Sequence, residues 1–373
     1  MIYLDNNATT RVADEVLEAM TPYYREAYGN PHSLHSLGQR AHDGIESARA
    51  DVATLLGCDP AEVIFNSCGT EGNAMVIRGL LDVIPSRRKV VATSVEHPSV
   101  LALLRAVAAA GQIELTVVPV DSDGAIDLDA MRDAIDDTTL LVSVMLAQNE
   151  TGVLHPIKDI AALAHARGAL LHVDAVQAAG KVPLAMHDLG ADLLTISGHK
   201  FHAPKGVGAL AIRHGLSLRP LWYGGGQELG LRSGTEPVPS IVALGVASRM
   251  ARETALHYDA VRSLRDRFEA EVLRRVPDTS VNGATQPRLG NTANISFHDR
   301  QADTLVRTFD GAGLCASAGA ACHSGNVEPS GTMKAMGKPL PVAMGAVRFS
   351  LSRYTTGEEV DRAIETVSRI AAR

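Results

Sequence analysis

The pattern of apolar and polar positions along the chain is most regular in its middle part. There, short runs that are apolar throughout alternate with segments whose apolar positions recur every three or four residues. The first pattern is typical of strands buried on both faces, and the second is typical of amphipathic helices. The expected strands are residues 63–65, 90–94, 115–118, 140–146, 169–173, 193–196 and 208–212. This alternation predicts an α/β fold with a mostly parallel sheet and helices on both faces.

Helical periodicity fills the gaps between these strands and extends to both sides of them. The expected helices are residues 14–27 (disturbed by Pro22), 36–55 (stopped by Gly57), 73–81, 99–110, 128–135, 156–166 and a long one over 240–276. Short strands are expected at 2–4, 293–297 and 347–351, and helices at 302–309 and 356–371, the last with Thr356 and Glu359 as a capping box. We therefore expect a large domain over 14–255 and a smaller α+β domain formed by 1–13 and 256–373.

Composition narrows the class of protein. Of the 373 residues, 46% are hydrophobic and 21% are charged, as in ordinary globular proteins. A net charge of −7 with no basic tract argues against direct nucleic-acid binding, and no apolar run approaches the length of a membrane span. The start shows no basic region followed by an apolar one, so we expect a cytoplasmic protein. The four cysteines form no CxxC pair and are expected to be reduced.

Polar residues that could carry chemistry follow the expected strands. Ligands of open α/β sheets bind beyond the carboxyl ends of the strands. The residues in such positions are Thr70, His97, Asn149, Asp174, Gln177, Ser197, His199 and Lys200. Each has an ordinary alternative when taken alone: Lys200 could reach solvent, Asp174 could cap a helix, and the segment Gly69-Thr70 could be a tight turn. Their joint occurrence at one edge of the sheet points to a site.

That set of side chains suits pyridoxal phosphate. Lys200 would form the Schiff base, and Asp174 would keep the pyridine nitrogen protonated so that the ring acts as an electron sink. A helix that begins at Gly69-Thr70 would hold the phosphate with its free N–H groups. His97 would stack on the ring, and Gln177 would donate to its phenolic oxygen. We expect no metal site.

The sequence resembles the cysteine desulfurases of the class V (fold type I) aminotransferase group, specifically the housekeeping and nitrogenase-associated branch. The matching stretches run nearly end to end and keep their order. They are residues 3–10 (YLDNNATT), 29–31 (GNP), 70–71 (TE), 96–97 (EH), 149–150 (NE), 172–177 (HVDAVQ), 197–200 (SGHK), 232–235 (RSGT) and 348–351 (RFSL).

The resemblance implies roles for individual residues. Thr70, Ser197 and His199 would bind the cofactor phosphate, and Thr235 would do so from the neighbouring subunit of a homodimer. Asn149 would contact the ring hydroxyl and the substrate. The substrate carboxylate would be bound by Arg348, whose planar fork suits that task, with help from Asn30.

The resemblance also implies that Cys322, in the small-residue stretch 319–325 (GAACHSG), accepts the sulfur. Such a stretch predicts a mobile loop. Cys58, Cys68 and Cys315 are interpreted as structural thiols. The chain departs from the family where Ala318 and Ala320 replace serines and where His323 replaces threonine, which puts the efficiency of persulfide formation in question.

The implied reaction converts L-cysteine to L-alanine and leaves a persulfide on Cys322, with Lys200 or His97 moving the α-proton. An acceptor protein would then take the sulfur for iron–sulfur cluster assembly, tRNA thiolation or DNA phosphorothioation; the sequence leaves this choice open. The alternatives are a selenocysteine lyase, an aminotransferase that would not need Cys322, and a non-catalytic sulfur-carrier scaffold. A nicotinamide dehydrogenase is disfavoured because no GxGxxG follows an early strand.

Overall fold

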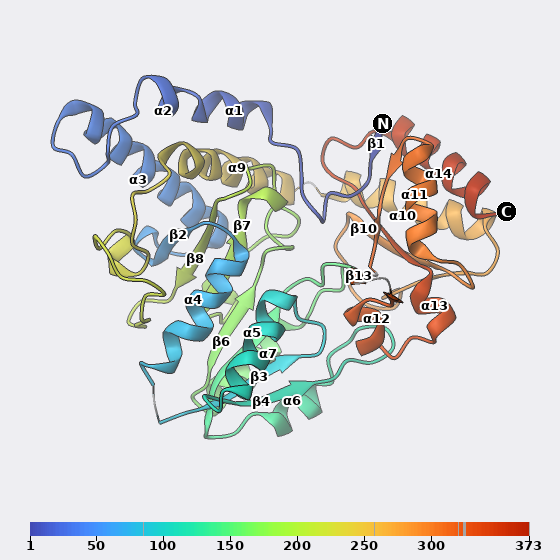
Figure 1. Ribbon diagram of the computed structural model, residues 1–373, viewed down its shortest axis with the longest axis horizontal. Helices are drawn as coiled ribbons and strands as arrows, with labels where there is room; N and C mark the ends of the chain where they lie inside the picture. Colours follow the sequence, from blue (N-terminus) through green and yellow to red (C-terminus); the bar gives the residue numbers. More distant parts are fainter. Residues whose placement is uncertain (85, 257, 320, 324–325, 373) are drawn as a thin grey trace.

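The computed structural model describes residues 1–84, 86–256, 258–319, 321–323 and 326–372, and for 321–323, 326 and 327 it describes the backbone only. Its main sheet has seven strands (Figure 1). In spatial order they are β2 (Val63–Asn66), β8 (Gly208–Ile212), β7 (Leu193–Ser197), β6 (Leu170–Asp174), β5 (Thr139–Met145), β3 (Lys89–Thr93) and β4 (Glu114–Val118). Neighbours from β7 to β4 are parallel, whereas β8 runs antiparallel to both β7 and β2. The predicted mostly parallel sheet is confirmed.

Helices cover both faces of this sheet because the strands present apolar side chains on both. Val91 and Val173 belong to one buried cluster, and the strand residues Val90 and Leu193 belong to another. Helices α1 (Asp14–Met20), α3 (Ser36–Leu56), α6 (Leu128–Ala134), α7 (Ile157–Ala166) and α9 (Val238–Leu256) contribute to the first cluster. Helices α4 (Gly69–Leu81) and α5 (Pro98–Ala109) contribute to the second. The short helices α2 (Pro22–Arg25) and α8 (Met186–Leu189) complete this part.

A second, antiparallel sheet lies beside the main sheet and its covering helices, on the side of both chain termini in Figure 1. Its strands, in spatial order, are β12 (Ser317–Ala318), β15 (Ala346–Ser350), β10 (Thr292–Phe297) and β9 (Thr279–Val281). Helices α10 (Asp259–Arg275), α11 (Ala302–Gly311) and α14 (Gly357–Ala371) pack on it around four buried phenylalanines. Near it lie α12 (Gly331–Ala335), α13 (Leu340–Met344) and the hairpin of β13 (Ala321–His323) and β14 (Asn326–Glu328).

The N-terminal segment joins this second core. Strand β1 (Ile2–Tyr3) pairs in parallel with β11 (Leu314–Cys315), and the side chains of Ile2 and Leu4 are buried in the same cluster as the phenylalanines. The domain boundaries at residues 13 and 255 stay a prediction. Along the described part of the chain, no helix combines the length and apolarity that crossing a bilayer requires.

One predicted element is wrong. The expected long helix over 240–276 consists of two helices, α9 and α10, with Tyr258 outside both of them. The apolar residues of α9 pack in the first cluster of the main sheet, whereas Val261, Phe268 and Val272 of α10 pack in the second core. Both segments have helical periodicity, so the periodicity alone does not show where one helix ends and the next begins. Gly57 ends α3 in the left-handed conformation, as expected.

The capping box of α14 provides a test of local stability. Thr356 Oγ1 accepts the N–H of Glu359 (3.2 Å), and the Glu359 carboxylate accepts the N–H of Thr356 (2.9 Å). Thr356→Ala removes one of these bonds and should weaken the helix start by about 1 kcal/mol, because the orphan N–H loses its acceptor. Amide hydrogen exchange in the first turn of α14 should then be about fivefold faster.

Ser368→Ala in the same helix is the matched control. The Ser368 hydroxyl has no hydrogen-bond partner among the described residues, and alanine is the better helix former. Exchange in α14 should therefore be unchanged or slower in this variant. Equal acceleration by both substitutions would contradict the role assigned to the cap.

Candidate active site

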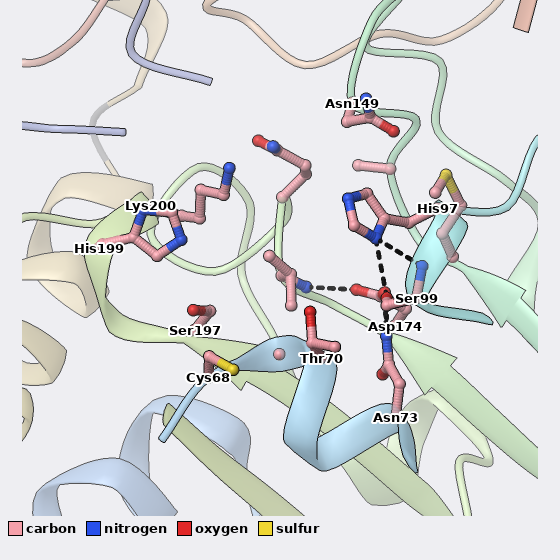
Figure 2. A pocket seen from close by; sticks show the side chains of 15 residues that line it. Cys68, Thr70, Asn73, His97, Ser99, Asn149, Asp174, Ser197, His199 and Lys200 are labelled. Carbon is pink, nitrogen blue, oxygen red and sulfur yellow. Dashed lines mark hydrogen bonds between the residues drawn. The ribbon is translucent and has the colours of Figure 1, made fainter. Parts of the chain in front are cut away.

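A cavity of about 220 Å³ opens where the parallel strands end at their carboxyl edge (Figure 2). Residues that follow β2, β3, β5, β6 and β7 line it, so segments far apart in the sequence meet at one place. The predicted site residues in its wall are Thr70, His97, Asn149, Asp174, Gln177, Ser197, His199 and Lys200. The structure therefore brings together the set that the strand ends indicated.

Asp174 is the last residue of β6, and its carboxylate is held in a fixed orientation. One oxygen accepts an N–H of the Asn73 amide (2.9 Å), and the other accepts the backbone N–H of Val176 (3.0 Å). The residue is only 5% exposed, yet it belongs to the cavity wall. The helix-cap alternative considered from the sequence is not what the structure shows: among the described residues no helix begins directly after Asp174, and its carboxylate accepts the Val176 N–H in the segment that follows β6.

Lys200 lies in a short 3₁₀ helix directly after β7, and its amine turns back toward the N-terminal segment. The Nζ atom donates to the carbonyl oxygens of Asn7 (2.6 Å) and Ala8 (2.9 Å). Burial and the charge of Arg348 lower the pKa of Lys200 to about 8, against the opposing effects of Asp5 and Asp174. A lysine with this pKa supplies free amine at neutral pH far more readily than an ordinary one.

His97 is the N-cap residue of α5, which begins at Pro98. Its Nδ1 accepts the backbone N–H of Ser99 (3.1 Å) and lies 2.8 Å from the Ser99 hydroxyl. Burial lowers the pKa of His97; Asp174 raises it and Lys200 lowers it further. Since Nδ1 accepts the Ser99 N–H, the proton of the neutral ring lies on Nε2. The imidazole thus lines the cavity in a defined tautomer.

The wall opposite His97 provides donors for an anion. Helix α4 begins at Gly69, so the N–H groups of its first turn have no acceptor within the helix. The Ser197 hydroxyl is buried without a hydrogen-bond partner among the described residues. A Cβ atom at Gly69 would lie 2.7 Å from Cγ2 of Val176, so glycine keeps this approach open. Burial and then Lys200 lower the pKa of His199 to about 4, which leaves its ring neutral.

Arg348 reaches the site from β15 but does not line the 220 Å³ cavity. Its guanidinium donates to the Asn149 carbonyl (2.9 Å) and pairs with the Asp5 carboxylate (2.8 Å). Its Nε atom is buried without a partner among the described residues. Sequence reasoning missed Asp5 as the counter-ion, although Asp5 stands in the stretch 3–10 that it singled out.

The other predicted site residues lie apart from the cavity of their own chain. Asn30 is exposed and its side chain accepts the N–H of His32 (2.9 Å). Thr235 is exposed as well. The backbone of Cys322 pairs with Val327 in the β13–β14 hairpin, but the side chains of Cys322 and His323, and all of Ala320, lie outside the described residues. The roles of Asn30, Thr235 and Cys322 stay predictions.

The surroundings of three cysteines can be compared with their interpretation as structural thiols, and only Cys68 departs from it. Cys68, expected to be a buried structural thiol, is half-buried and lines the cavity as the N-cap residue of α4. Burial, with Glu62 and Asp59 adding to it, raises the pKa of Cys58 to about 12, as suits an inert thiol. Burial also raises the pKa of Cys315.

Sequence reasoning also missed Asn73 and Ser99. Asn73 lies one turn into α4, where it reaches Asp174, and Ser99 bonds to both Asn73 and His97. The helical spacing from Gly69 to Asn73 was the available signal, because it places Asn73 on the same face of α4 as the helix start.

Comparisons with known proteins agree with this geometry. A family model described as aminotransferase class-V matches residues 2–363. A cysteine desulfurase of Nostoc sp. is 46% identical over 376 aligned positions, which cover 100% of this chain and 93% of that protein. A solved NifS-like protein matches with a TM-score of 0.92 at 37% identity, covering 99% of this chain and 98% of its own.

A second solved structure, SspA in complex with cysteine, matches with a TM-score of 0.84 at 31% identity, covering 95% of this chain and 100% of its own. The likeness thus extends over nearly the whole chain in both sequence and fold. Residues 2–363, which carry the sheet, the cavity and Arg348, match one family, and the chain belongs to the class-V aminotransferases.

Proposed function

We propose that this protein is a pyridoxal-phosphate-dependent cysteine desulfurase, which converts L-cysteine to L-alanine and leaves the sulfur as a persulfide on Cys322. The observation that carries the proposal is the convergence of Lys200, Asp174 and His97 on one cavity. The cavity is also lined by Ser197, whose hydroxyl has no hydrogen-bond partner in the described part of the chain. Relatives named cysteine desulfurases that match the whole chain support the choice of reaction.

The residues present fit pyridoxal phosphate. The start of α4 together with Thr70, Ser197 and His199 offers N–H and O–H donors for a phosphate, and the Ser197 hydroxyl would gain the partner it lacks. Asp174 offers a carboxylate for a protonated ring nitrogen, and Lys200 offers an amine for the aldehyde. When bound, the cofactor supplies the electron sink that lets a proton leave the substrate α-carbon.

The chain's own residues bind and orient the substrate. Arg348 keeps an Nε donor that has no partner among the described residues beside its pair with Asp5, so it can take a substrate carboxylate, with Asn149 and Asn30 assisting. Asn149 lines the cavity, and its backbone carbonyl accepts a hydrogen bond from Arg348. Lys200 and His97 face the cavity as the groups that move the α-proton.

Cys322 provides the nucleophile for the sulfur. Its thiolate attacks the substrate sulfur, a sulfur–sulfur bond forms, and the bond between the substrate sulfur and Cβ breaks. The electron pair of the broken bond stays with the carbon side, which takes up a proton and becomes the methyl group of alanine. The net products are L-alanine and a persulfide on Cys322. An acceptor protein then takes the outer sulfur of this persulfide for iron–sulfur cluster assembly, tRNA thiolation or DNA phosphorothioation.

We also propose that the protein works as a cytoplasmic homodimer. Thr235 is exposed and outside the cavity of its own chain, which leaves it available to the phosphate site of a second copy. The division into a large domain over 14–255 and a small domain of 1–13 and 256–373 fits the separate apolar core around Phe268 and Phe349.

A single-turnover reaction with L-cysteine tests the proposed function. Alanine should form in step with a gain of one sulfur atom on the Cys322 peptide, measured by amino-acid analysis and mass spectrometry. 3-Mercaptopyruvate in place of alanine would instead identify an aminotransferase, because transamination keeps the sulfur on the carbon chain. Alanine from selenocysteine but not from cysteine would identify a selenocysteine lyase. If neither substrate gave a product, the non-catalytic sulfur-carrier scaffold would be the remaining alternative.

Two substitutions separate attachment of the cofactor from acceptance of sulfur. Lys200→Ala should lose the visible absorbance of covalently bound pyridoxal phosphate and all alanine formation, because the amine is gone. Cys322→Ser should keep the absorbance but accumulate no persulfide. Cys58→Ser is the matched control and should retain both properties, since the high pKa of Cys58 keeps it from acting as a thiolate. Sulfur transfer by Cys322→Ser at the wild-type rate would rule out the role given to Cys322.

The lowered pKa of Lys200 predicts a distinct pH profile for its chemical reactivity. With a pKa of about 8, about a fifth of the Lys200 side chains are unprotonated at pH 7.4, compared with about one in a thousand for an ordinary lysine. In the cofactor-free protein, acetylation of Lys200 followed by mass spectrometry should be half-maximal near pH 8 and level off above pH 9. A rate that still rises tenfold between pH 9 and 10 would contradict the lowered pKa.

A further inference from the structure

Asn7 lies fully buried between the cofactor side and the substrate side of the site, and all of its polar groups are engaged. Its contacts come from residues at the ends of five strands of the two sheets, β5, β6, β7, β10 and β15. The backbone carbonyl of Asn7 accepts hydrogen bonds from Lys200 Nζ (2.6 Å) and Gln177 Nε2 (2.9 Å), and its backbone N–H donates to Ser350 Oγ (2.9 Å). Its side-chain oxygen Oδ1 accepts from Asn291 Nδ2 (2.9 Å) and Lys181 Nζ (3.3 Å). Its side-chain nitrogen Nδ2 donates to Thr292 Oγ1 (2.9 Å) and to the Asn149 carbonyl (3.3 Å).

Lys181 is a second buried lysine in this network, and the mechanism above does not use it. It is 6% exposed, and its amine donates to Gln177 Oε1 (2.8 Å) as well as to Asn7 Oδ1. Both acceptors are amide oxygens, and among the described residues Lys181 forms no ion pair. A buried lysine without a carboxylate partner is unusual, because burial of an unpaired charge is costly.

The orientation of the side-chain amides of Asn7 and Gln177 follows from their contacts with backbone carbonyl oxygens, which can only accept hydrogen bonds. The Asn7 carbonyl requires the NH₂ group of Gln177 on its side, so Gln177 Oε1 faces Lys181. The Asn149 carbonyl likewise requires the NH₂ group of Asn7, so Asn7 Oδ1 faces Lys181. The Lys181 amine therefore acts as a donor to both oxygens and fixes both side chains.

Burial and neighbouring charges disfavour the protonated form of the Lys181 amine. The cations that face it are Lys200, which follows β7, and Arg348 of β15. Burial, and then these two charges, lower the pKa of Lys181 well below its usual value. In either protonation state its amine can donate the hydrogen bonds to Asn7 Oδ1 and Gln177 Oε1.

We propose that Lys181 is a positioning residue for Lys200. By fixing Asn7 and Gln177, it holds the Asn7 and Ala8 carbonyls as a resting place for the Lys200 amine whenever that amine is not covalently attached. Lys200 then stays next to the cavity, aligned to move the substrate α-proton and to attach again. The inference rests on the proposed function, and it gives Lys181 a role that reaches the reaction only through Lys200.

Lys181→Met tests this in the cofactor-free protein, without substrate. The methionine fills the space but donates no hydrogen bond, so the amides of Asn7 and Gln177 lose their common donor and the Lys200 amine loses its fixed acceptors. Acetylation of Lys200 by acetic anhydride at pH 8 should be about threefold faster than in the wild type, while acetylation of the exposed Lys158 should be unchanged. In the loaded enzyme, kcat for L-cysteine should fall about tenfold with KM within twofold.

Two further variants keep the test decisive. Lys181→Gln retains a neutral N–H donor and should recover at least part of both effects, whereas Lys158→Met should behave as the wild type. If Lys181→Met does not fold, Asn7→Ser removes the same side-chain anchor and should also speed up acetylation of Lys200.

Wild-type acetylation of Lys200 in a Lys181→Met protein with an unchanged melting temperature would overturn the proposal. So would a faster reaction of Lys200 and Lys158 alike, which would indicate general loosening of the fold. Failure of the wild type to form alanine would instead overturn the proposed function, and the acetylation result would still decide the role of Lys181.

Discussion

The site depends on holding a lysine amine where its positive charge is costly. Lys200 is partly dehydrated and faces Arg348, and these effects outweigh the attraction of Asp5 and Asp174. The pairing of Arg348 with Asp5 is part of this balance, because it places an anion beside the guanidinium without a direct bond from Asp5 to Lys200. The amine is instead bound by two uncharged carbonyls. A carboxylate in their place would favour the ammonium form and remove the nucleophile.

A second ionisable group near the cavity, Glu96, also lies where its charge is costly. Glu96 is buried, and burial raises its pKa to about 8, with Asp174 adding to the effect. Thr93 and the Met145 N–H both donate to one oxygen of Glu96, and the other oxygen has no partner among the described residues. The proton of Glu96 therefore belongs on that second oxygen. The negative charge is left on Asp174, whose two oxygens each accept an N–H.

The sequence could predict the sheet and the cavity wall because both follow from local pattern. A parallel sheet places all its strand ends at one edge, so polar residues after β3, β5, β6 and β7 had to meet. The expected domain boundary at residue 255 lies close to the break between α9 and α10, but the break itself was not predicted, because both segments have helical periodicity. The contacts of Asn7 and Lys181 were equally hidden. Asn7 lies more than a hundred positions from Lys181 and from Lys200 in the chain, so no local pattern connects these residues.

The N-terminal segment explains why residues so distant in sequence form one site. Ile2 and Leu4 anchor it in the second core, and a few residues later it reaches the cavity of the main sheet. Asp5 pairs with Arg348, the residue proposed to bind the substrate, and the Asn7 carbonyl accepts a hydrogen bond from Lys200, the residue proposed to react with it. A few consecutive residues thus contact both a guanidinium of the second sheet and an amine that follows a strand of the main sheet. In the proposed function, this segment ties the group that binds the substrate carboxylate to the group that reacts with the substrate.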